Sequence, residues 1–198
     1  LLFKIIYFPL LIVLLNINFV TASKFSSKAK YATVIDLDTG AVLYSKNATS
    51  KIYPASMSKL MTLYILFEEI QNGSLSLDTK LNVSEKAWRK GGSKMFLEPG
   101  TEVTVSDILK GIIIQSGNDA CIVVAENISG DEDSFADLMN EKAQELNLQY
   151  SNFTNSTGWP DENHYMTVSD LAILSAKIIK DFPEFFYLFK EKRFTYNE

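Results

Sequence analysis

Residues 53–62 read YPASMSKLMT, and this stretch marks the start of the most regular segment in the chain. Pro54 interrupts the residues before it, and Ser56 stands where a helix begins. Asn72-Gly73 is a typical helix end. Between these two points, apolar residues recur at the three- and four-residue spacing of a helix, at Leu60, Leu63, Tyr64, Phe67 and Ile70. The pattern predicts a helix from Ser56 to Gln71.

The segments on either side of this helix predict an α/β inventory. Residues 31–37, YATVIDL, are apolar and β-branched, and the turn DTG at 38–40 leads into AVLYS, which predicts a β-hairpin. Residues 74–105 are irregular with short strands, and helices are expected at DILKGIIIQ, DACIVVAENI, 133–146 and TVSDLAILSAKIIK, the last opened by Thr167 or Ser169. Because a lone hairpin is marginal, either the domain is mostly helical or further strands lie beyond Glu198.

The first 22 residues have the character of an export signal. One lysine precedes a long apolar run, and Val20-Thr21-Ala22 fits a signal-peptidase site. The apolar run is short for a spanning helix and is interrupted by Pro9, although an uncleaved membrane anchor is the alternative. We therefore expect residues 1–22 to be a signal peptide and residues 23–198 to be the folded part.

Composition excludes several classes of function. The 198 residues carry a net charge of −5 without a cluster of Lys or Arg, which argues against nucleic-acid binding. One cysteine and one histidine cannot build a Cys/His zinc site, and no metal is expected. Cys121, in the apolar run CIVVA, is predicted to be a core residue. A Ser-His-Asp triad would have to use His164.

The spacing of Ser56 and Lys59 suggests chemistry but does not prove it. Ser27-Lys28-Ala29-Lys30 has the same spacing in a polar segment without a following helix. On a helix, Ser56 and Lys59 would share one face, with Ser56 at the positive end of the helix dipole. The simpler interpretation is that Ser56 or Ser58 caps the helix and Lys59 is solvated. A lysine base must be neutral, so its pKa must fall from about 10.4 towards 7, a cost near 5 kcal/mol.

Ser116-Gly117-Asn118 is the second candidate pair. The simpler interpretation is a turn between two helices, with Asn118 as the N-cap of the second. The functional interpretation is that the turn presents both side chains to a cleft. Ser116 would then relay a proton, while Asn118 would hold Lys59 and a substrate amide.

Taken together, these motifs resemble those of a known family. PASMSKLMT followed by SGN is similar to the penicillin-binding serine acyl-transferases, above all the low-molecular-mass D-alanyl-D-alanine carboxypeptidases. The likeness extends over nearly all of residues 31–198, in family order, through YATVIDLDTGAVLYSKNA, SKMFLEPG, VSDILKGIIIQSGNDACIVVAE, FADLMNEKAQELNL and FTNSTGWPDENHYMTVSDLAIL. It implies an α/β fold of the β-lactamase/transpeptidase type, in which an antiparallel sheet packs with a helical subdomain.

The resemblance also implies a role for each candidate residue. Ser56 becomes the acylated nucleophile, Lys59 its proton acceptor and Ser116 a proton relay, with Asn118 beside them and Ser93 in substrate binding. The implied substrate is a peptidoglycan stem peptide ending in D-Ala-D-Ala, β-lactams acylate the same serine, and no cofactor is needed. The implied location is the periplasm or the outer face of the bacterial cytoplasmic membrane, with peripheral membrane association.

Two departures from the family pattern qualify this prediction. The third motif, Lys-Thr-Gly or Lys-Ser-Gly, does not occur, and Ser156-Thr157-Gly158 has the wrong first residue. We therefore expect a C-terminally truncated enzyme that lacks the later strands of the sheet. Met166 stands where the family usually has a small residue.

Three other interpretations compete with an active carboxypeptidase. The first is an inactive remnant, and the second is a D-Ala-D-Ala endopeptidase of the same superfamily. A class A β-lactamase is disfavoured, because Ala143 occupies the place of its deacylating glutamate.

Overall fold

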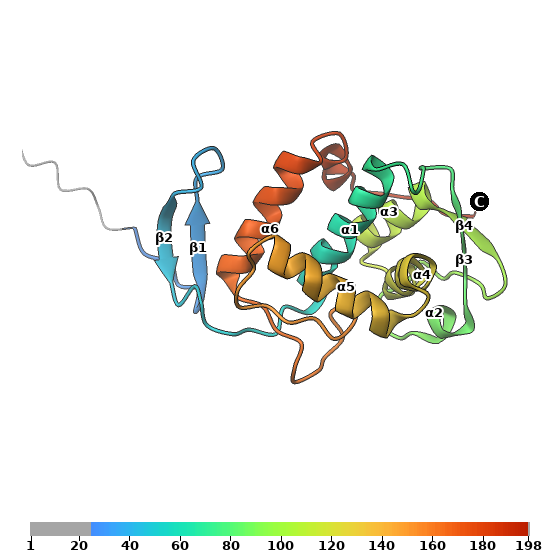
Figure 1. Cartoon of the computed structure of the whole chain (residues 1–198), viewed down its shortest axis with the longest axis horizontal. Coiled ribbons are helices and arrows are strands. Elements are labelled where there is room, and N and C mark those ends of the chain that lie inside the picture. The colour runs from blue at the N-terminus through green and yellow to red at the C-terminus, as the bar shows by residue number, and fades with distance from the viewer. Residues whose placement is uncertain (1–24, 198) are drawn as a thin grey trace, which may run out of the picture.

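The computed structural model describes residues 25–197, so the predicted signal peptide at 1–22 lies outside the described residues. Figure 1 shows a helical body with a two-stranded sheet at each end. The strands are β1 (Ala32–Ile35), β2 (Val42–Lys46), β3 (Lys80–Asn82) and β4 (Glu102–Thr104). The helices are α1 (Lys59–Gln71), α2 (Glu85–Arg89), α3 (Val105–Gln115), α4 (Asn118–Ser129), α5 (Glu132–Glu145) and α6 (Val168–Asp181), with 3₁₀ turns η1 (Ala55–Ser58) and η2 (Phe186–Lys190).

Helix α1 is the centre of the body, as Figure 1 shows, and it contacts α3, α4, α5 and α6. A helix that is buried on nearly all sides is a core element, and residues 61–67 of α1 are all buried. The predicted helix is therefore confirmed, with one difference at its start. Ser56 lies in the tighter turn η1, and the α-helical part begins at Lys59.

The helix starts follow from short polar side chains. In four helices an N-cap oxygen accepts the backbone N–H three residues later, which satisfies one of the free amides of the first turn. These caps are Ser84, Thr104, Asp131 and Thr167, and the last decides between the two predicted caps of α6. Asn118 is the first residue of α4 rather than its N-cap, a position that Gly117 takes.

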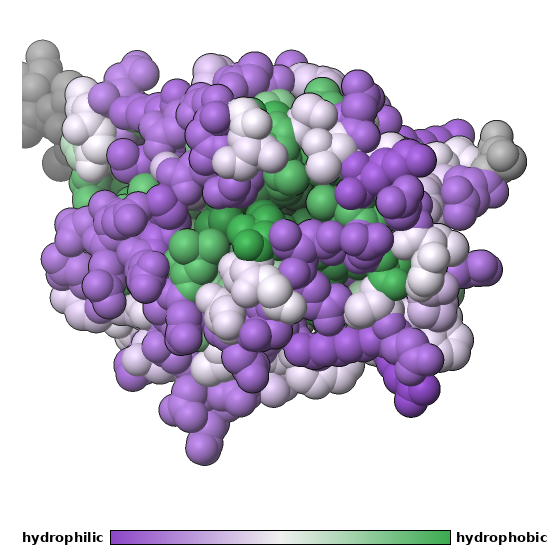
Figure 2. Space-filling model, turned by 45° about the vertical axis from the view of Figure 1, so that its right-hand side comes forward, coloured by the Kyte–Doolittle hydropathy of each residue, from purple (hydrophilic) through white to green (hydrophobic). Residues whose placement is uncertain are grey.

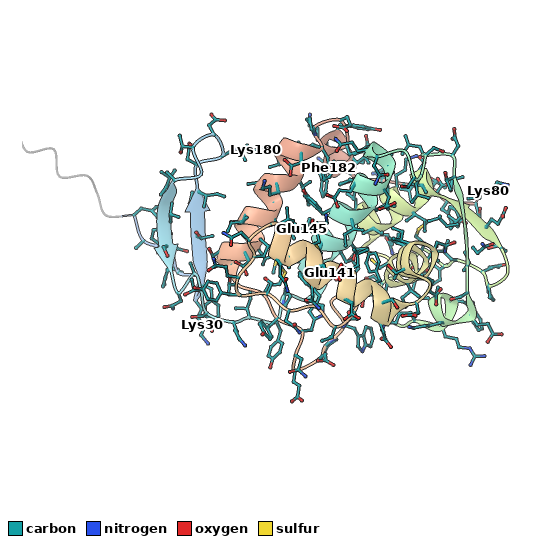
Figure 3. The ribbon with its side chains drawn as sticks, viewed as in Figure 1. Lys30, Lys80, Glu141, Glu145, Lys180 and Phe182 are labelled. Atoms are coloured by element: carbon teal, nitrogen blue, oxygen red, sulfur yellow. The ribbon has the colours of Figure 1, made fainter. Side chains whose placement is uncertain are left out.

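The predicted hairpin is confirmed as β1 and β2, which pair antiparallel with Thr33 opposite Ser45 and an irregularity between Val34 and Ile35. Strand β1 packs against α6. Lys180, labelled in Figure 3, donates from Nζ to the Asp38 carbonyl oxygen at 3.4 Å. Within residues 25–197 the strands form two small sheets, β1–β2 and β3–β4, and the fold is α/β as predicted.

Aromatic side chains fasten the C-terminal part of the chain to α1. Phe182, labelled in Figure 3, has its ring 4.9 Å from that of Tyr64 and 5.5 Å from that of Phe67, centroid to centroid. Phe185 stacks on Phe67 at 4.8 Å. Cys121 of α4 is fully buried, which confirms its predicted place in the core.

The surface is largely hydrophilic. Figure 2 shows polar residues over most of one face and a hollow with hydrophobic side chains at its floor. Among the helices of residues 25–197, none combines the length and the apolar character that crossing a membrane requires.

Candidate active site

Ser56 and Lys59 form a direct pair at the start of α1. The Lys59 Nζ lies 3.0 Å from the Ser56 Oγ, close enough for a hydrogen bond. The 3₁₀ turn η1 brings the two side chains, three residues apart in the sequence, to the same side of the helix. Ser56 is exposed to solvent, whereas Lys59 is buried. The geometry gives an accessible hydroxyl with a buried amine behind it.

The surroundings of Lys59 disfavour its charged form. Its side chain is 3% exposed, and burial lowers the pKa of the amine, while Cys121 acts to raise it and the positive charge of Lys90 acts to lower it. The second hydrogen-bond partner of Lys59 within the described residues is the Thr157 carbonyl oxygen, at 2.8 Å from Nζ. Both partners are neutral groups. Lys59 is thus disposed to lose its proton and act as a base.

The loop around Ser156-Thr157-Gly158 completes this side of the site. Sequence reasoning set these residues aside, and the structure brings the Thr157 carbonyl onto Lys59. Gly158 has φ +78, and a Cβ built there would lie 1.9 Å from the Ala55 carbonyl oxygen. A side chain at 158 would therefore push the loop away from the turn that carries Ser56. A glycine directly after Thr157 was the available sequence signal for this close approach.

A buried carboxylate holds the same loop from behind. Glu132, at the start of α5, accepts hydrogen bonds on Oε1 from the Ser156 hydroxyl at 2.8 Å and the Ser156 amide at 3.2 Å. Its other oxygen lies 3.1 Å from the Lys86 Nζ. The Thr62 hydroxyl donates to the Ser156 carbonyl oxygen at 2.7 Å. Ser156 is fully buried by these contacts, which fix the residue before Thr157.

Ser116 faces the pair from α3. Together with Ser56 and Lys59 it lines a depression of about 290 Å³, whose apolar wall includes Ile112 and Phe189. Ser116 caps the end of α3 in the left-handed conformation, with φ 58 and ψ 37. The structure therefore brings three of the predicted site residues to one depression. The proton-relay role of Ser116 stays a prediction.

Asn118 and Ser93 are joined to each other instead. The Asn118 backbone N–H donates to the Ser93 carbonyl oxygen at 2.8 Å, and its side-chain Nδ2 donates to the Gly91 carbonyl oxygen at 2.8 Å. In the described residues the Asn118 amide thus fixes the 91–93 loop, whereas sequence reasoning directed it toward Lys59. Ser93 is exposed. Their roles toward substrate stay predictions.

Two other side chains with reactive groups, Cys121 and His164, are buried. Cys121 is fully buried, and burial raises the pKa of its thiol to about 12, so it is uncharged at neutral pH. His164 lies in the predicted loop but is 2% exposed, with its Nε2 at 2.7 Å from the Ser58 hydroxyl. Among residues 25–197 no cluster of three or more His, Cys, Asp or Glu side chains is placed to hold a metal ion.

Comparison with known families identifies this arrangement. The model of the D-alanyl-D-alanine carboxypeptidase family matches residues 18–198. The chain belongs to this family. The chain is similar to D-alanyl-D-alanine carboxypeptidase DacF of Bacillus subtilis. The two are 46% identical over 158 residues, which are 80% of this chain and 41% of that protein. DacA of Haemophilus influenzae is 38% identical over 173 residues, or 86% of this chain and 44% of that protein.

Solved structures agree with the family assignment. The chain is similar to penicillin binding protein 5 from Haemophilus influenzae, with TM-score 0.85 and 36% identity over 89% of this chain and 52% of that one. It is also similar to the carboxypeptidase DacD from Francisella tularensis, with TM-score 0.83 and 37% identity over 85% of this chain and 41% of that one. These matches confirm the predicted β-lactamase/transpeptidase-like fold. The chain spans less than half the length of the two curated relatives above.

Proposed function

We propose that the chain carries the acylating centre of a serine-type D-Ala-D-Ala carboxypeptidase that acts on peptidoglycan stem peptides. The observation that carries this proposal is the 3.0 Å contact between the exposed Ser56 hydroxyl and the buried Lys59 amine. Burial lowers the pKa of Lys59, which favours the neutral amine that a base requires. A serine at the start of a helix supplies a nucleophile next to free backbone N–H groups.

The proposed reaction has two halves. Neutral Lys59 accepts the Ser56 proton while Oγ attacks the carbonyl carbon of the penultimate D-Ala, and the Ser56 N–H stabilises the oxyanion. The C–N bond then breaks, the proton passes through Ser116 to the leaving amine, and free D-Ala departs. Water hydrolyses the remaining serine ester, which returns Ser56 as a hydroxyl. Asn118 and Ser93 are proposed to contact the substrate, and the chemistry uses no cofactor.

The same serine is proposed to react with β-lactams. One related structure, penicillin-binding protein D2 from Listeria monocytogenes, is an ampicillin-bound form, with 28% identity and TM-score 0.73. A β-lactam carries its strained amide where the substrate carries its D-Ala-D-Ala bond. The depression of about 290 Å³ beside Ser56 supports access of a β-lactam to the serine hydroxyl.

Carboxypeptidase activity is favoured over endopeptidase activity by the relatives. A D-alanyl-D-alanine endopeptidase of Pseudomonas aeruginosa is 31% identical over 64% of this chain. The carboxypeptidase DacF is 46% identical over 80% of it. Because the two activities differ in the leaving group, D-Ala release and cleavage of cross-linked peptides distinguish them.

Export of the protein belongs to the same proposal. Because the proposed substrate is part of the cell wall, residues 23–198 must reach the periplasm or the outer face of the membrane. Residues 1–22 would be the signal peptide that directs this export. Sequencing the N-terminus of the secreted protein tests this. A mature protein that begins at Ser23 supports it, whereas retention of residues 1–22 in the membrane contradicts it.

The experiment that tests the activity is intact-mass analysis of the 198-residue chain after incubation with a fluorescent penicillin. We expect one adduct per chain, its loss in Ser56→Ala, and its retention in Ser27→Ala, the matched serine of the other Ser-x-x-Lys stretch. D-Ala release from a peptide ending in D-Ala-D-Ala is measured in parallel. The third motif is not among the 198 residues, so an adduct would show that the first two motifs are sufficient for acylation. A folded chain that takes no adduct contradicts the proposal.

A further inference from the structure

The turn that carries Ser56 has an unfavourable backbone conformation at Ala55, which requires support from neighbouring residues. Ala55 has φ 49, in the left-handed region that alanine rarely adopts. Such a conformation persists only where the surrounding structure enforces it. The Ser58 hydroxyl is one such support, because it donates to the Ala55 carbonyl oxygen at 2.9 Å and so closes the turn around Ser56.

The Ser58 hydroxyl is itself held by the one histidine of the chain. His164 Nε2 lies 2.7 Å from the Ser58 Oγ, across 106 residues of sequence. The other ring nitrogen, Nδ1, accepts the Thr154 backbone N–H at 3.2 Å. A nitrogen that accepts an N–H cannot also carry a proton, so the network assigns the proton to Nε2. Nε2–H then donates to Ser58, and the Ser58 proton stays directed at Ala55.

The imidazole therefore connects the segment that carries Ser56 with the loop that contacts Lys59. Its Nε2 is hydrogen-bonded to Ser58 in the turn of Ser56, and its Nδ1 is hydrogen-bonded to Thr154. That residue begins the loop whose Thr157 carbonyl lies 2.8 Å from the Lys59 Nζ. We propose that His164, as a neutral Nε2–H imidazole, is a positioning residue that sets the distance between the Ser56 hydroxyl and the Lys59 amine. This role rests on the proposed function, since it matters to the reaction only if Ser56 is acylated.

Ionisation of His164 opposes the bridge. A proton on Nδ1 would meet the Thr154 N–H, and the acceptor that residues 25–197 offer to Nδ1 is the Thr154 hydroxyl at 3.4 Å, a long hydrogen bond. Burial lowers the pKa of the imidazole, while the negative charge of Asp161 acts in the opposite direction. The ring edge otherwise packs on Phe153, and Lys59, next to Ser58, is turned to Thr157. The bridge is therefore intact at neutral pH and lost in acid.

The first test observes the imidazole directly. Because the chain has one histidine, the ¹⁵N signals of a histidine-labelled sample belong to His164 alone. We expect a protonated Nε2 and an unprotonated Nδ1 at pH 7, with titration below the ordinary value of 6.5. An Nδ1–H tautomer, or a charged ring at pH 7, overturns the proposal. This measurement needs no activity, so it is independent of whether Ser56 is acylated.

The second test separates positioning from packing. His164→Gln keeps a donor for Ser58 and an acceptor for Thr154 but does not titrate, whereas His164→Ala removes both contacts. For penicillin acylation, we expect His164→Ala to lower the acylation rate constant about 10- to 100-fold with little change in initial binding. His164→Gln should stay within a few-fold of wild type and lose the decline that the imidazole causes in acid.

Phe153→Leu is the control, because it disturbs the packing of the ring without touching either hydrogen bond. Equal losses in Phe153→Leu and His164→Ala, or equal losses in His164→Gln and His164→Ala, overturn the proposal. If His164→Ala does not fold, the proposal is tested by the tautomer of His164 and by the pH dependence of acylation in His164→Gln. If the wild-type chain is not acylated, amide hydrogen exchange is measured in place of the acylation rate constant. The bridge then requires faster exchange in both 55–59 and 154–158 in His164→Ala, and a change in one segment alone overturns it.

Discussion

The chain contains the pattern Ser-x-x-Lys in two regions, and only in one of them are the two side chains joined by a hydrogen bond. In the N-terminal region, the Ser27 hydroxyl accepts the Ala29 backbone N–H at 3.1 Å, and Lys30 is exposed, with its Nζ 5.2 Å from the centre of the Tyr31 ring. In α1, the Lys59 Nζ is buried and lies 3.0 Å from the Ser56 Oγ.

The difference between the two regions shows what the spacing lacks. A helical turn places residues i and i+3 on one face, and the segment of Ser27 has no such turn. Burial does the rest, because it disfavours the charged form of Lys59 and leaves it the Thr157 carbonyl as a neutral partner. The pair is therefore a product of the helix and of a loop about a hundred residues later, and not of the four-residue pattern.

The sharpest way to break the comparison is to remove each lysine in turn. Lys59→Met takes away the base at nearly constant volume, and we expect the rate of penicillin acylation to fall by about 10²–10⁴-fold. Lys30→Met, in the other pattern, should leave the rate unchanged. Intact-mass time courses of both variants give the rates. Equal rates for Lys59→Met and wild type would contradict the assigned base.

A pair of glycines sharpens the comparison at the next level. Gly158 and Gly40 both have positive φ, +78 and +73, but a Cβ at 158 would lie 1.9 Å from the Ala55 carbonyl oxygen, while nothing lies within 4 Å of one at 40. The backbone term, about 1–2 kcal/mol, is common to both alanine variants. Overpacking should add about 1–3 kcal/mol for Gly158→Ala alone.

Urea unfolding of the two variants measures this difference in the free energy of unfolding. Acylation is expected to fall about 10- to 100-fold in Gly158→Ala, because the loop that holds Lys59 is displaced, and to be unchanged in Gly40→Ala. If the two variants lose equal stability and both keep full acylation, the close approach of the loop to the turn does not matter.

The smallest expected effect concerns the support behind the loop. Glu132→Ala leaves the buried Ser156 hydroxyl and amide without their acceptor, which should lower stability by about 1.5–3 kcal/mol and acylation by about tenfold. Glu132→Gln keeps an acceptor oxygen and should lose less. Lys86→Ala removes a half-exposed lysine from the buried Glu132 carboxylate but leaves the hydrogen bonds from Ser156 in place, so it should lower stability less than Glu132→Ala. Thermal unfolding and acylation rates measured together test this order, and a larger loss in Lys86→Ala than in Glu132→Ala would reverse it.

Much of the fold could be predicted from the sequence because its signals are local. The apolar spacing of α1, the hairpin turn at Asp38-Thr39-Gly40 and the cap at Thr167 each depend on residues close together in the chain. The short helix α2 and the turn η2 were missed, since neither is long enough to show a period. The pairing of Ser56 with Lys59 followed from their spacing once a helix was expected.

The remainder of the site depends on contacts that leave no mark on residue type. The second partner of Lys59 is a backbone carbonyl, and any residue at 157 would provide one. His164 stands in a polar stretch, yet its ring is buried against Ser58, 106 residues earlier. Asn118 was expected to face Lys59, but its amide is engaged by Gly91, whose approach depends on how the 91–93 loop folds back.

The most direct test of the account is the pH dependence of penicillin acylation. Only neutral Lys59 can accept the Ser56 proton, so the rate should rise with pH as the amine loses its proton and then level off. Because burial lowers the pKa of Lys59, the plateau should begin below the ordinary lysine value of 10.5. His164→Gln, measured beside wild type, removes the only imidazole and should reach the same plateau. A rate that continues to rise tenfold per pH unit up to pH 10 would contradict the claim that burial makes Lys59 the base.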